Sequence, residues 1–496
     1  MRGEMRVRYV VAAMVLAMVG SVIVAAPAGA APAASTPING RIAWARTNGD
    51  ILAITKVEGS GAHLIAFGGN FTAVITPDGA SHAAKNFAVV DEFTGAPVYP
   101  GNADSYVRAI SSRAGTIYVG GSFSTFGGVS RSRLAALSPS FTVTSWNPSA
   151  TSTIRAVLAS AAGVYYGGEG TSVKLANLTS GATVMSQPTG GGAVRALALS
   201  PDSAWLYVGG GFETYGGLPR HGLIRANSLS GVPDKGFNAN FRADSGVGTH
   251  GSYDGEAGNV LRFNTDGSRL LVGVAGYGAD EFKVLNPTTG AKYWQVGLPG
   301  YGQGVGVVGS TYVVGYHRHD DNPWPYFAAQ VEASNGALTN WDPGVTGFQS
   351  NADGGNNGVQ AIYVDPVYRR VFLAGAFTSP VKSLAVYTWG APVTPPPPNK
   401  VPTARFTASA QGLAASFDGS TSSDPDGSIT SWAWTFGDGT TGTGATAQHT
   451  YAAAGTYPVT LKVTDDAGAT APASASLTVS VPVTPASPPP PPPADR

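Results

Sequence analysis

The densest group of chemically active side chains in this sequence lies in one short loop rich in His, Asp and Pro. It reads GYHRHDDNPWPY over residues 315–326, and its candidate ligand-binding residues are His317, His319, Asp320, Asp321 and Trp324. Imidazole and carboxylate groups are compatible with a metal ion, and paired aspartates with acid–base catalysis. The group matches no established metal or catalytic spacing, so a polar loop covering a seam of the fold is the simpler interpretation. We assign no catalytic residue.

A second group of chemically active residues recurs at one position of a repeat. Arginine stands between apolar residues in three segments, VRA, IRA and VRA, as Arg108, Arg155 and Arg195. Amides occupy the matching or a nearby position further along, as Asn259, Gln303 and Gln360. Three guanidinium groups around one axis would offer forked donors to a carboxylate or sulfate. Alternatively, each arginine bonds backbone carbonyl groups or a carboxylate and holds neighbouring repeats together.

The element that positions these side chains is a strand repeat, most regular over residues 107–148. Short apolar or alternating runs predict four strands, at 107–111, 117–121, 134–137 and 141–146. Gly127-Gly128 and Ser138-Pro139 between them take turn conformations at little steric cost. Because four such strands cannot bury an apolar face alone, the unit requires neighbours of its own kind.

Copies of this unit recur along the chain and are marked by a glycine pair. We take the second glycine, or its nearest counterpart, as Gly69, Gly121, Gly168, Gly210, Gly273, Gly315 and Gly375. The spacing is near that of propeller blades, about 40–50 residues, and longer where loops are inserted. The units run approximately over 51–106, 107–153, 154–193, 194–257, 258–300, 301–357 and 358–392. We therefore expect an all-β chain with a seven-bladed β-propeller over 31–392.

Two of the units also share a specific pattern, V-G-G-x-F-x-x-x-G-G-x-x-R, within residues 107–148 and 194–240. This pattern resembles the delta-60 repeat, a family of extracellular bacterial propellers. The resemblance implies an exported propeller protein. Because the innermost strands of a propeller line its central channel, we expect the arginines and amides to ring that channel.

The ring needs an element to close it, because the seventh unit offers three strands before a proline-rich linker begins. An open strand edge is unfavourable in a propeller. The segment GRIAWART at 40–47 places Trp44 where Trp146, Trp294 and Trp341 stand in their own units. We expect this segment to pair with the seventh unit and close the ring. The alternative is that Trp44 covers the first unit alone.

Residues 1–30 have the features of a secretory signal peptide. Three arginines precede an apolar run, and Ala28-Gly29-Ala30 provides a cleavage site. An uncleaved membrane anchor is the alternative, because about 18 apolar residues just span a bilayer. We expect a secreted, extracellular protein with no membrane contact after cleavage of the signal.

Composition excludes several classes of function. The 30 basic and 30 acidic residues balance, so neither nucleic acid nor an anionic membrane is an expected partner. With no cysteine among 496 residues, disulfide bonds, a thiol nucleophile and cysteine-ligated metal sites are excluded. Stability therefore has to come from the packing of the repeats.

A separate domain follows a stiff linker, TPPPP, within residues 393–398. The segments SDPDG at 423–427, WAWTFGDG at 432–439 and GTYPVTLKVTDD at 455–466 resemble a PKD domain, an immunoglobulin-like β-sandwich. We place this domain at 399–482 and a disordered proline-rich tail at 483–496.

The resemblance to PKD domains also implies a Ca²⁺ site, because some members of that family bind this ion. The matching oxygen ligands are Asn399, Asp424, Asp426 and Asp465. Carboxylate and carbonyl oxygens brought from several turns suit calcium. Asp-Pro-Asp-Gly is equally a good turn sequence, and no other cofactor is expected.

Two classes of function fit this organisation. In the first, the chain is an exported binding or scaffold protein whose propeller presents a glycan- or ligand-binding surface, with the PKD domain as spacer or polymer contact. Its partner is then an extracellular polysaccharide or a cell-surface protein. In the second, the chain is a secreted carbohydrate-active enzyme, a glycosidase or polysaccharide lyase. Fold alone does not decide between them, and the scattered His and acidic residues favour binding.

Overall fold

The computed structural model describes residues 37–59, 63–241, 256–276, 280–317, 327–348, 358–391, 393 and 399–481. All regular structure in these residues is β-strand, which confirms the predicted all-β class. Among them, no helix is long and apolar enough to cross a membrane. The predicted signal peptide and proline-rich tail lie outside the described residues, as do His319, Asp320, Asp321 and Trp324.

Antiparallel sheets follow one another along the first part of the described chain. The first sheet contains β3 (Asp50–Lys56), β4 (Leu64–Asn70), β7 (Phe87–Asp91) and β8 (Pro97–Tyr99). The second contains β9 (Val107–Arg113), β10 (Thr116–Gly121) and β13 (Leu134–Leu137). The third contains β14 (Ile154–Ala159), β15 (Val164–Gly168), β16 (Ser172–Ala176) and β17 (Thr183–Gly190). The fourth contains β18 (Val194–Leu199), β19 (Trp205–Gly210) and β22 (Leu223–Asn227).

Three further sheets follow the same plan. The fifth contains β23 (Ala257–Phe263), β24 (Leu270–Ala275), β25 (Glu281–Leu285) and β26 (Lys292–Gly297). The sixth contains β27 (Gly302–Val308), β28 (Thr311–Tyr316) and β29 (Ala328–Glu332). The seventh contains β31 (Gly358–Asp365), β32 (Arg370–Ser379), β33 (Leu384–Trp389) and the N-terminal strand β1 (Ile38–Ile42). Short strands complete the connections: β2 (Arg46–Thr47), β5 (Ala73–Ile75), β6 (Ser81–Ala83), β11 (Thr125–Phe126), β12 (Val129–Ser130), β20 (Thr214–Tyr215), β21 (Leu218–Pro219) and β30 (Thr346–Phe348).

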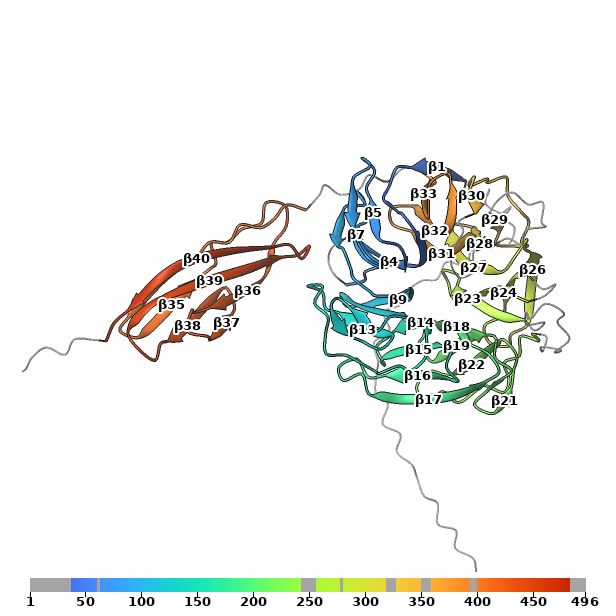
Figure 1. The fold of residues 1–496 in the computed structure, drawn as a ribbon, viewed down its shortest axis with the longest axis horizontal. Helices are drawn as coiled ribbons and strands as arrows, with labels where there is room; N and C mark the ends of the chain where they lie inside the picture. The colour runs from blue at the N-terminus through green and yellow to red at the C-terminus, as the bar shows by residue number, and fades with distance from the viewer. Residues whose placement is uncertain are drawn as a thin grey trace, which may run out of the picture. The chain divides into compact units, whose positions relative to one another are not determined.

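The first strands of these sheets form a closed ring. Each packs against the next, in the order β3, β9, β14, β18, β23, β27 and β31, and β31 packs against β3. Figure 1 shows these strands around a common centre, with the later strands of each sheet farther out. The apolar core is divided accordingly, because each of its clusters joins side chains from two neighbouring sheets. This arrangement is a β-propeller.

The N-terminal strand joins the last sheet of the ring. β1 pairs with β33, with Arg41 opposite Tyr387 and Ile42 opposite Val386. The strand ends at Ile42 and so lies N-terminal to much of the predicted range 40–47, and Trp44 follows the strand instead of lying within it. The first strand of the described chain is therefore paired with the sheet that comes last in sequence.

Trp44 links the seventh sheet to the first. Its buried ring meets Phe372 of β32 edge-on at 5.1 Å, and its indole N–H donates to the carbonyl oxygen of Glu92 at 2.9 Å. Equivalent bonds at other seams join Trp146 to Asn177 at 2.9 Å and Trp294 to Ala333 at 3.2 Å. Each acceptor directly follows the third strand of its sheet. Trp44 therefore has the same place in the seventh sheet as the other tryptophans have in theirs.

The prediction of a strand at 141–146 is wrong, because these residues form no strand. Phe141 has a φ of 60°, in the left-handed region, and Val143 makes a single bridge to Leu137. The Phe141 ring instead stacks on Tyr99 of the first sheet, with ring centroids 5.5 Å apart. Packing across the seam therefore outweighs the alternating pattern that suggested a strand.

The glycine pair near the end of the second strand in sheets one to four has two separate roles. A Cβ on Gly121 would lie 2.0 Å from the carbonyl oxygen of Tyr106, so the second glycine lets the first strand of its own sheet approach. A Cβ on Gly120 would lie 2.6 Å from Ile154, so the first glycine admits a side chain of the next sheet. The pair is required by close packing on both sides.

Three sheets depart from this pattern, and in the seventh the first position is Ala374. Gly273 and Gly315 correspond in register to the first glycine of the pair, not to the second as predicted. In the fifth sheet the second position is Val274, and its partner is Gly258; in the sixth sheet these are Tyr316 and Gly302. The small residue has thus moved to the facing strand, which preserves the close approach of the two backbones.

The C-terminal domain is a sandwich of two sheets. One contains β34 (Thr407–Gln411), β35 (Ala414–Asp418) and β38 (Thr446–Thr450). The other contains β37 (Thr441–Thr443), β36 (Ile429–Thr435), β39 (Gly455–Asp465) and β40 (Thr470–Val479). Trp434 and Phe436 are buried between the sheets with Val459 and Leu461, as the alternating pattern predicted. The immunoglobulin-like sandwich is therefore confirmed.

Candidate functional site

Each first strand of the propeller carries a β-bulge near its start. At this point the ladder to the second strand skips one residue, which is Leu52, Arg108, Arg155, Arg195, Asn259, Gln303 or Gln360. A bulge leaves its extra residue outside the ladder and redirects the side chain. Together with Tyr301, these same residues line one cavity of about 310 Å³. We call it the channel cavity, because strands from every sheet of the ring surround it.

The channel cavity brings together the arginines and amides that the repeat predicted. Sheets two to four supply one arc of its wall, the cationic arc, made of Arg108, Arg155 and Arg195. The remaining sheets supply the neutral arc, made of Asn259, Tyr301, Gln303, Gln360 and Leu52. The cavity is therefore electrostatically one-sided, with guanidinium groups facing amides and a phenol.

Neighbouring polar groups position the cationic arc. Arg155 donates from Nε and Nη2 to Oε1 of Glu169, at 3.1 and 2.7 Å. Arg195 Nη1 donates to Oδ1 of Asn259 at 2.8 Å, which ties the two arcs together. The guanidinium of Arg108 lies 5.0 Å from the ring of Tyr106. The alternative prediction is that each arginine bonds backbone carbonyl groups or a carboxylate and holds neighbouring repeats together. The contacts match it in part: Arg155 bonds a carboxylate within its own sheet, and Arg195 joins two sheets through an amide.

The neutral arc contains a buried acceptor that lacks a donor. Oε1 of Gln303 is buried and accepts no hydrogen bond from the described part of the chain. Burial, aided by Asp280, raises the pKa of Tyr301, whereas Arg195 lowers it. Tyr301 therefore keeps its phenolic proton at neutral pH, and Arg195 lies within electrostatic range of it from another sheet.

His317 is the one residue of the predicted His/Asp loop group that the structure describes. It is 6% exposed, and its ring meets Tyr301 edge-on at 4.5 Å. Its backbone N–H donates to the carbonyl oxygen of Tyr301 at 3.2 Å. His317 thus supports the wall of the channel cavity from behind and is not part of an exposed loop.

Sequence reasoning missed three residues of this site. Tyr301 stands two residues before Gln303, as Tyr106 stands before Arg108, so the repeat contained a signal for it. Glu169 directly follows a glycine pair. The residue after the other glycine pairs is not acidic, so the repeat gave no signal for Glu169. Leu52 occupies the bulge of the first sheet, and its apolar character hid it among core residues.

In the sandwich, the predicted calcium ligands have partners within the protein. Nδ2 of Asn399 donates to Oδ2 of Asp465 at 2.9 Å, and both oxygens of Asp426 accept from the N–H of Lys400 at 3.1 Å. Among the described residues, no group of three or more His, Cys, Asp or Glu side chains is arranged to hold a metal ion. These contacts are those of a tightly bonded turn.

Asp424 is the exception in this group. Both of its carboxylate oxygens are buried without a hydrogen bond of normal geometry from the described residues. Desolvation and the nearby carboxylates of Asp465, Asp426 and Asp466 raise its pKa, although the backbone N–H of Asp426 acts in the opposite direction. A Cβ on Gly427 would lie 2.6 Å from Oδ2 of Asp424 and 2.1 Å from Oδ1 of Asp466. Two carboxylates therefore converge beside Gly427, and the sequence analysis had missed Asp466.

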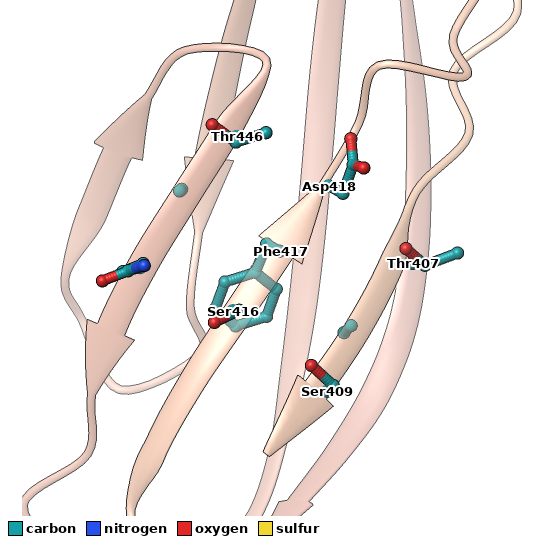
Figure 2. Close-up of a pocket in the computed structure, with 9 residues that line it drawn as sticks. Thr407, Ser409, Ser416, Phe417, Asp418 and Thr446 are labelled. Atoms are coloured by element: carbon teal, nitrogen blue, oxygen red, sulfur yellow. The ribbon is translucent and has the colours of Figure 1, made fainter. Parts of the chain in front are cut away.

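A larger hollow, of about 490 Å³, lies on one sheet of the sandwich (Figure 2). Short polar side chains line it, among them Thr407, Ser409, Ser416 and Thr446. Phe417, the residue after Ser416 in β35, belongs to the sandwich core. Alternation of buried apolar and exposed polar residues is normal for an antiparallel sheet with one solvated face. We assign no function to this surface.

Comparisons with known proteins agree with the two architectures. Residues 397–481 match the PKD domain family, and residues 115–140 match a domain of unknown function (DUF5122) described as a beta-propeller. The chain thus combines a β-propeller with an immunoglobulin-like β-sandwich. The sandwich is a PKD domain, so this is a PKD domain-containing propeller protein.

The curated relatives named below match a short part of the chain. The Pre-pro-metalloprotease PrtV of Vibrio cholerae is 49% identical over 70 residues, which are 14% of this chain and 8% of that protein. The Microbial collagenase of Vibrio alginolyticus is 41% identical over 75 residues, 14% of this chain and 9% of that protein. The crystal structure of the PKD1 domain from the Vibrio cholerae metalloprotease PrtV is 41% identical; it covers 16% of this chain and 100% of that chain, with a TM-score of 0.16. The chain therefore spans less than a tenth of these curated relatives.

Proposed function

We propose that this chain is an extracellular binding protein whose propeller holds an anionic ligand in the channel cavity. The PKD domain then serves as a spacer or a polymer contact. The partner we expect is an extracellular polysaccharide, with a cell-surface protein as the alternative. The observation that carries this proposal is the cationic arc, in which three bulged arginines face one cavity from consecutive sheets.

The extracellular location has support from two directions. The PKD domain is similar to domains in proteins named a metalloprotease and a collagenase, and a microbial collagenase has to meet its substrate outside the cell. The first 30 residues have the composition of a secretory signal peptide.

Binding fits the chemistry of the cavity better than catalysis. Glycosidases use a pair of carboxyl groups flanking the bond that they cleave. The described lining contains arginines, amides, a phenol and a leucine, and the nearby Glu169 is engaged by Arg155. Guanidinium and amide groups orient a ligand through hydrogen bonds without transferring protons at neutral pH.

A glycan array probed with the full chain tests this proposal, beside a turnover screen on polysaccharides. We expect binding to acidic glycans that weakens in high salt, because salt screens exposed charges. The variant Arg108→Gln/Arg155→Gln/Arg195→Gln should lose this binding. Arg269→Gln, which removes one positive charge from a stack on Tyr293 away from the cavity, is the control.

Three outcomes would contradict the proposal. Equal binding to neutral and acidic glycans would show that the cationic arc does not recognise the ligand. Undiminished binding by the triple variant, with its melting temperature preserved, would move the site elsewhere. Turnover of a polysaccharide that disappears in the triple variant would favour the alternative, a secreted carbohydrate-active enzyme.

A further inference from the structure

The unpaired acceptor in the channel cavity indicates what a ligand has to supply. Gln303 lines the cavity, and its Oε1 is buried and lacks a donor among the described residues. A buried acceptor without a partner costs about 1–3 kcal/mol, and a bound group that donates to it recovers that free energy. The ligand should therefore carry at least one hydroxyl or N–H group on the side of the neutral arc.

The opposite wall demands an acceptor. The guanidinium groups of Arg108, Arg155 and Arg195 can only donate. Glu169 contacts Arg155, so one carboxylate offsets the positive charge of the arc in part. A planar carboxylate matches the forked geometry of a guanidinium in a two-bond contact. A single carboxylate on the ligand meets both the geometry and the modest excess of charge.

We propose that the channel cavity binds a sugar acid, a ring that bears one carboxylate and several hydroxyl groups. This inference rests on the proposed binding function and names its ligand class. The carboxylate contacts the cationic arc, and a hydroxyl donates to Gln303. Asn259, Gln360 and the phenol of Tyr301 offer further hydrogen-bonding groups on the same side.

The size of the cavity is that of a site for one sugar residue. Side chains from the first strand of every sheet surround it, so a chain reaches it along the axis of the ring. Its volume of about 310 Å³ is at the lower end of the range for ligand sites, about 300–1,000 Å³. A single sugar residue, such as the terminal or branch residue of a polymer, matches this volume.

Isothermal titration calorimetry of the full chain with small probes separates the two requirements. Methyl glucuronide carries the carboxylate and the hydroxyl groups, and methyl glucoside carries the hydroxyl groups alone. Acetate carries the carboxylate alone, and glucose 6-sulfate replaces the carboxylate with a sulfate ester. We expect methyl glucuronide to bind at least about tenfold more tightly than each of the others, because each lacks or alters one charge-assisted or hydroxyl contact.

Two variants assign the contacts within the site. Arg108→Gln should weaken methyl glucuronide at least about tenfold, through loss of a charge-assisted hydrogen bond. Gln303→Leu should weaken it about fivefold while leaving the melting temperature of the free protein unchanged or higher, because it removes an unpaired buried oxygen. Gln330→Leu is the matched control in the same sheet: Gln330 is buried and hydrogen-bonded to Thr311 and Thr339, so its loss should lower the melting temperature and spare binding.

Several results would overturn the inference. Methyl glucoside, acetate or glucose 6-sulfate binding as tightly as methyl glucuronide would remove one of its two requirements. Failure of all four probes, with acidic glycans bound on the array, would reject the ligand class and leave the proposed function standing. A lower melting temperature for Gln303→Leu with unchanged binding would make Gln303 a structural residue.

Discussion

The indole N–H of Trp44 donates to the carbonyl oxygen of Glu92 over 2.9 Å, and this contact joins the two ends of the propeller. Nη1 of Arg370 donates to the same oxygen over 2.6 Å. Trp44 follows β1 and Arg370 begins β32, so both donors come from the seventh sheet, whereas the acceptor belongs to the first. The ring is therefore closed by side-chain bonds to one carbonyl group as well as by strand pairing.

Replacing Trp44 measures how much the propeller depends on this closure. Trp44→Ala should lower the free energy of unfolding by about 3–5 kcal/mol, because it empties a buried site against Phe372. Trp44→Phe keeps most of the packing and loses one hydrogen bond, so it should cost about 1 kcal/mol. Calorimetry of the full chain checks both values. Unchanged unfolding of the propeller in Trp44→Ala would show that this end of the chain does not hold the ring closed.

The carboxyl group of Glu92 lies in a buried cluster at the same seam. Glu92 and Asp365 are 0% and 1% exposed, and Nζ of Lys56 lies 3.0 Å from Glu92 and 3.9 Å from Asp365. Burial raises the pKa of Glu92 to about 8, with Asp365 adding to the rise and Lys56 opposing it. Further titratable groups surround this cluster: Glu58, His63, Asp91, Arg262, Tyr363, Tyr368 and Arg370.

The raised pKa of Glu92 predicts a loss of stability at alkaline pH. Between its ordinary value of 4.5 and about 8, Glu92 is protonated when folded and ionised when unfolded, so stability falls as the pH rises and levels off above about 8. The pKa of His63 is lowered from 6.5, mainly by burial, so its contribution rises with pH up to about 6.5 and opposes this trend. The pKa of Asp365 is lowered from 3.8: burial acts against this change, but Glu92 and Lys56 outweigh burial. Asp365 therefore changes the stability only below pH 3.8, outside this range.

The window from about pH 7 to 8 therefore isolates Glu92. There the free energy of unfolding should fall by up to about 1.4 kcal/mol per pH unit. Glu92→Gln should remove this slope, because the amide does not titrate. Glu332→Gln, at the end of β29 in the sixth sheet, is the control and should retain it. A propeller whose melting temperature is flat from pH 7 to 8 would contradict the prediction.

The repeat predicted much of the fold because its signals are local and recur. Turn glycines, apolar runs and the tryptophan position each report on a short segment, so the all-β class and the place of Trp44 in the last sheet could be predicted. The strand at 141–146 could not be excluded in the same way. Phe141 leaves the β conformation because of a contact with Tyr99, which is distant in sequence and invisible in the pattern.

The candidate site was predicted in part for the same reason. Arg108, Arg155 and Arg195 stand at the same position of their repeats. In the structure this position is a β-bulge, and all three side chains line one cavity. Glu169 and the unpaired oxygen of Gln303 depend on how side chains meet across the ring, which a repeat does not encode. His317 lay in a loop whose polarity suggested exposure, yet its ring is buried against Tyr301.

Two adjacent glycines of the fourth sheet test the role of the glycine pair. A Cβ on Gly210 would lie 2.1 Å from the carbonyl oxygen of Ala193, whereas one on Gly211 would have its nearest neighbour 4.0 Å away. Gly210→Ala should therefore destabilise the propeller by about 3 kcal/mol, the upper end for overpacking. Gly211→Ala should change its stability by less than about 0.5 kcal/mol. Chemical denaturation of both variants checks the difference. Equal effects would mean that the two strands move apart to accept the methyl group without a loss of stability.

The last prediction concerns calcium in the PKD domain. We propose that Asp424 is a ligand of this ion. Its two buried oxygens lack good donors among the described residues, and Asp466 converges on the same point beside Gly427. Carboxylates held close together repel one another, and a divalent cation with a preference for oxygen ligands would relieve that repulsion. Binding to the folded state at about 100 times the dissociation constant would add about 2.7 kcal/mol to its stability.

Calorimetry of the full chain in EDTA and in millimolar Ca²⁺ measures this effect on the transition of the sandwich. We expect Ca²⁺ to raise its melting temperature, and Asp424→Asn to abolish the rise because the amide weakens the charged ligand set. Asp418→Asn is the control, since Asp418 lies on another sheet and accepts a hydrogen bond from Ser420 at 2.9 Å. Mg²⁺ should substitute poorly, because it demands a smaller octahedral site and keeps its water. If Ca²⁺ leaves the parent protein unchanged, Asp424 and its neighbours form a turn and nothing more.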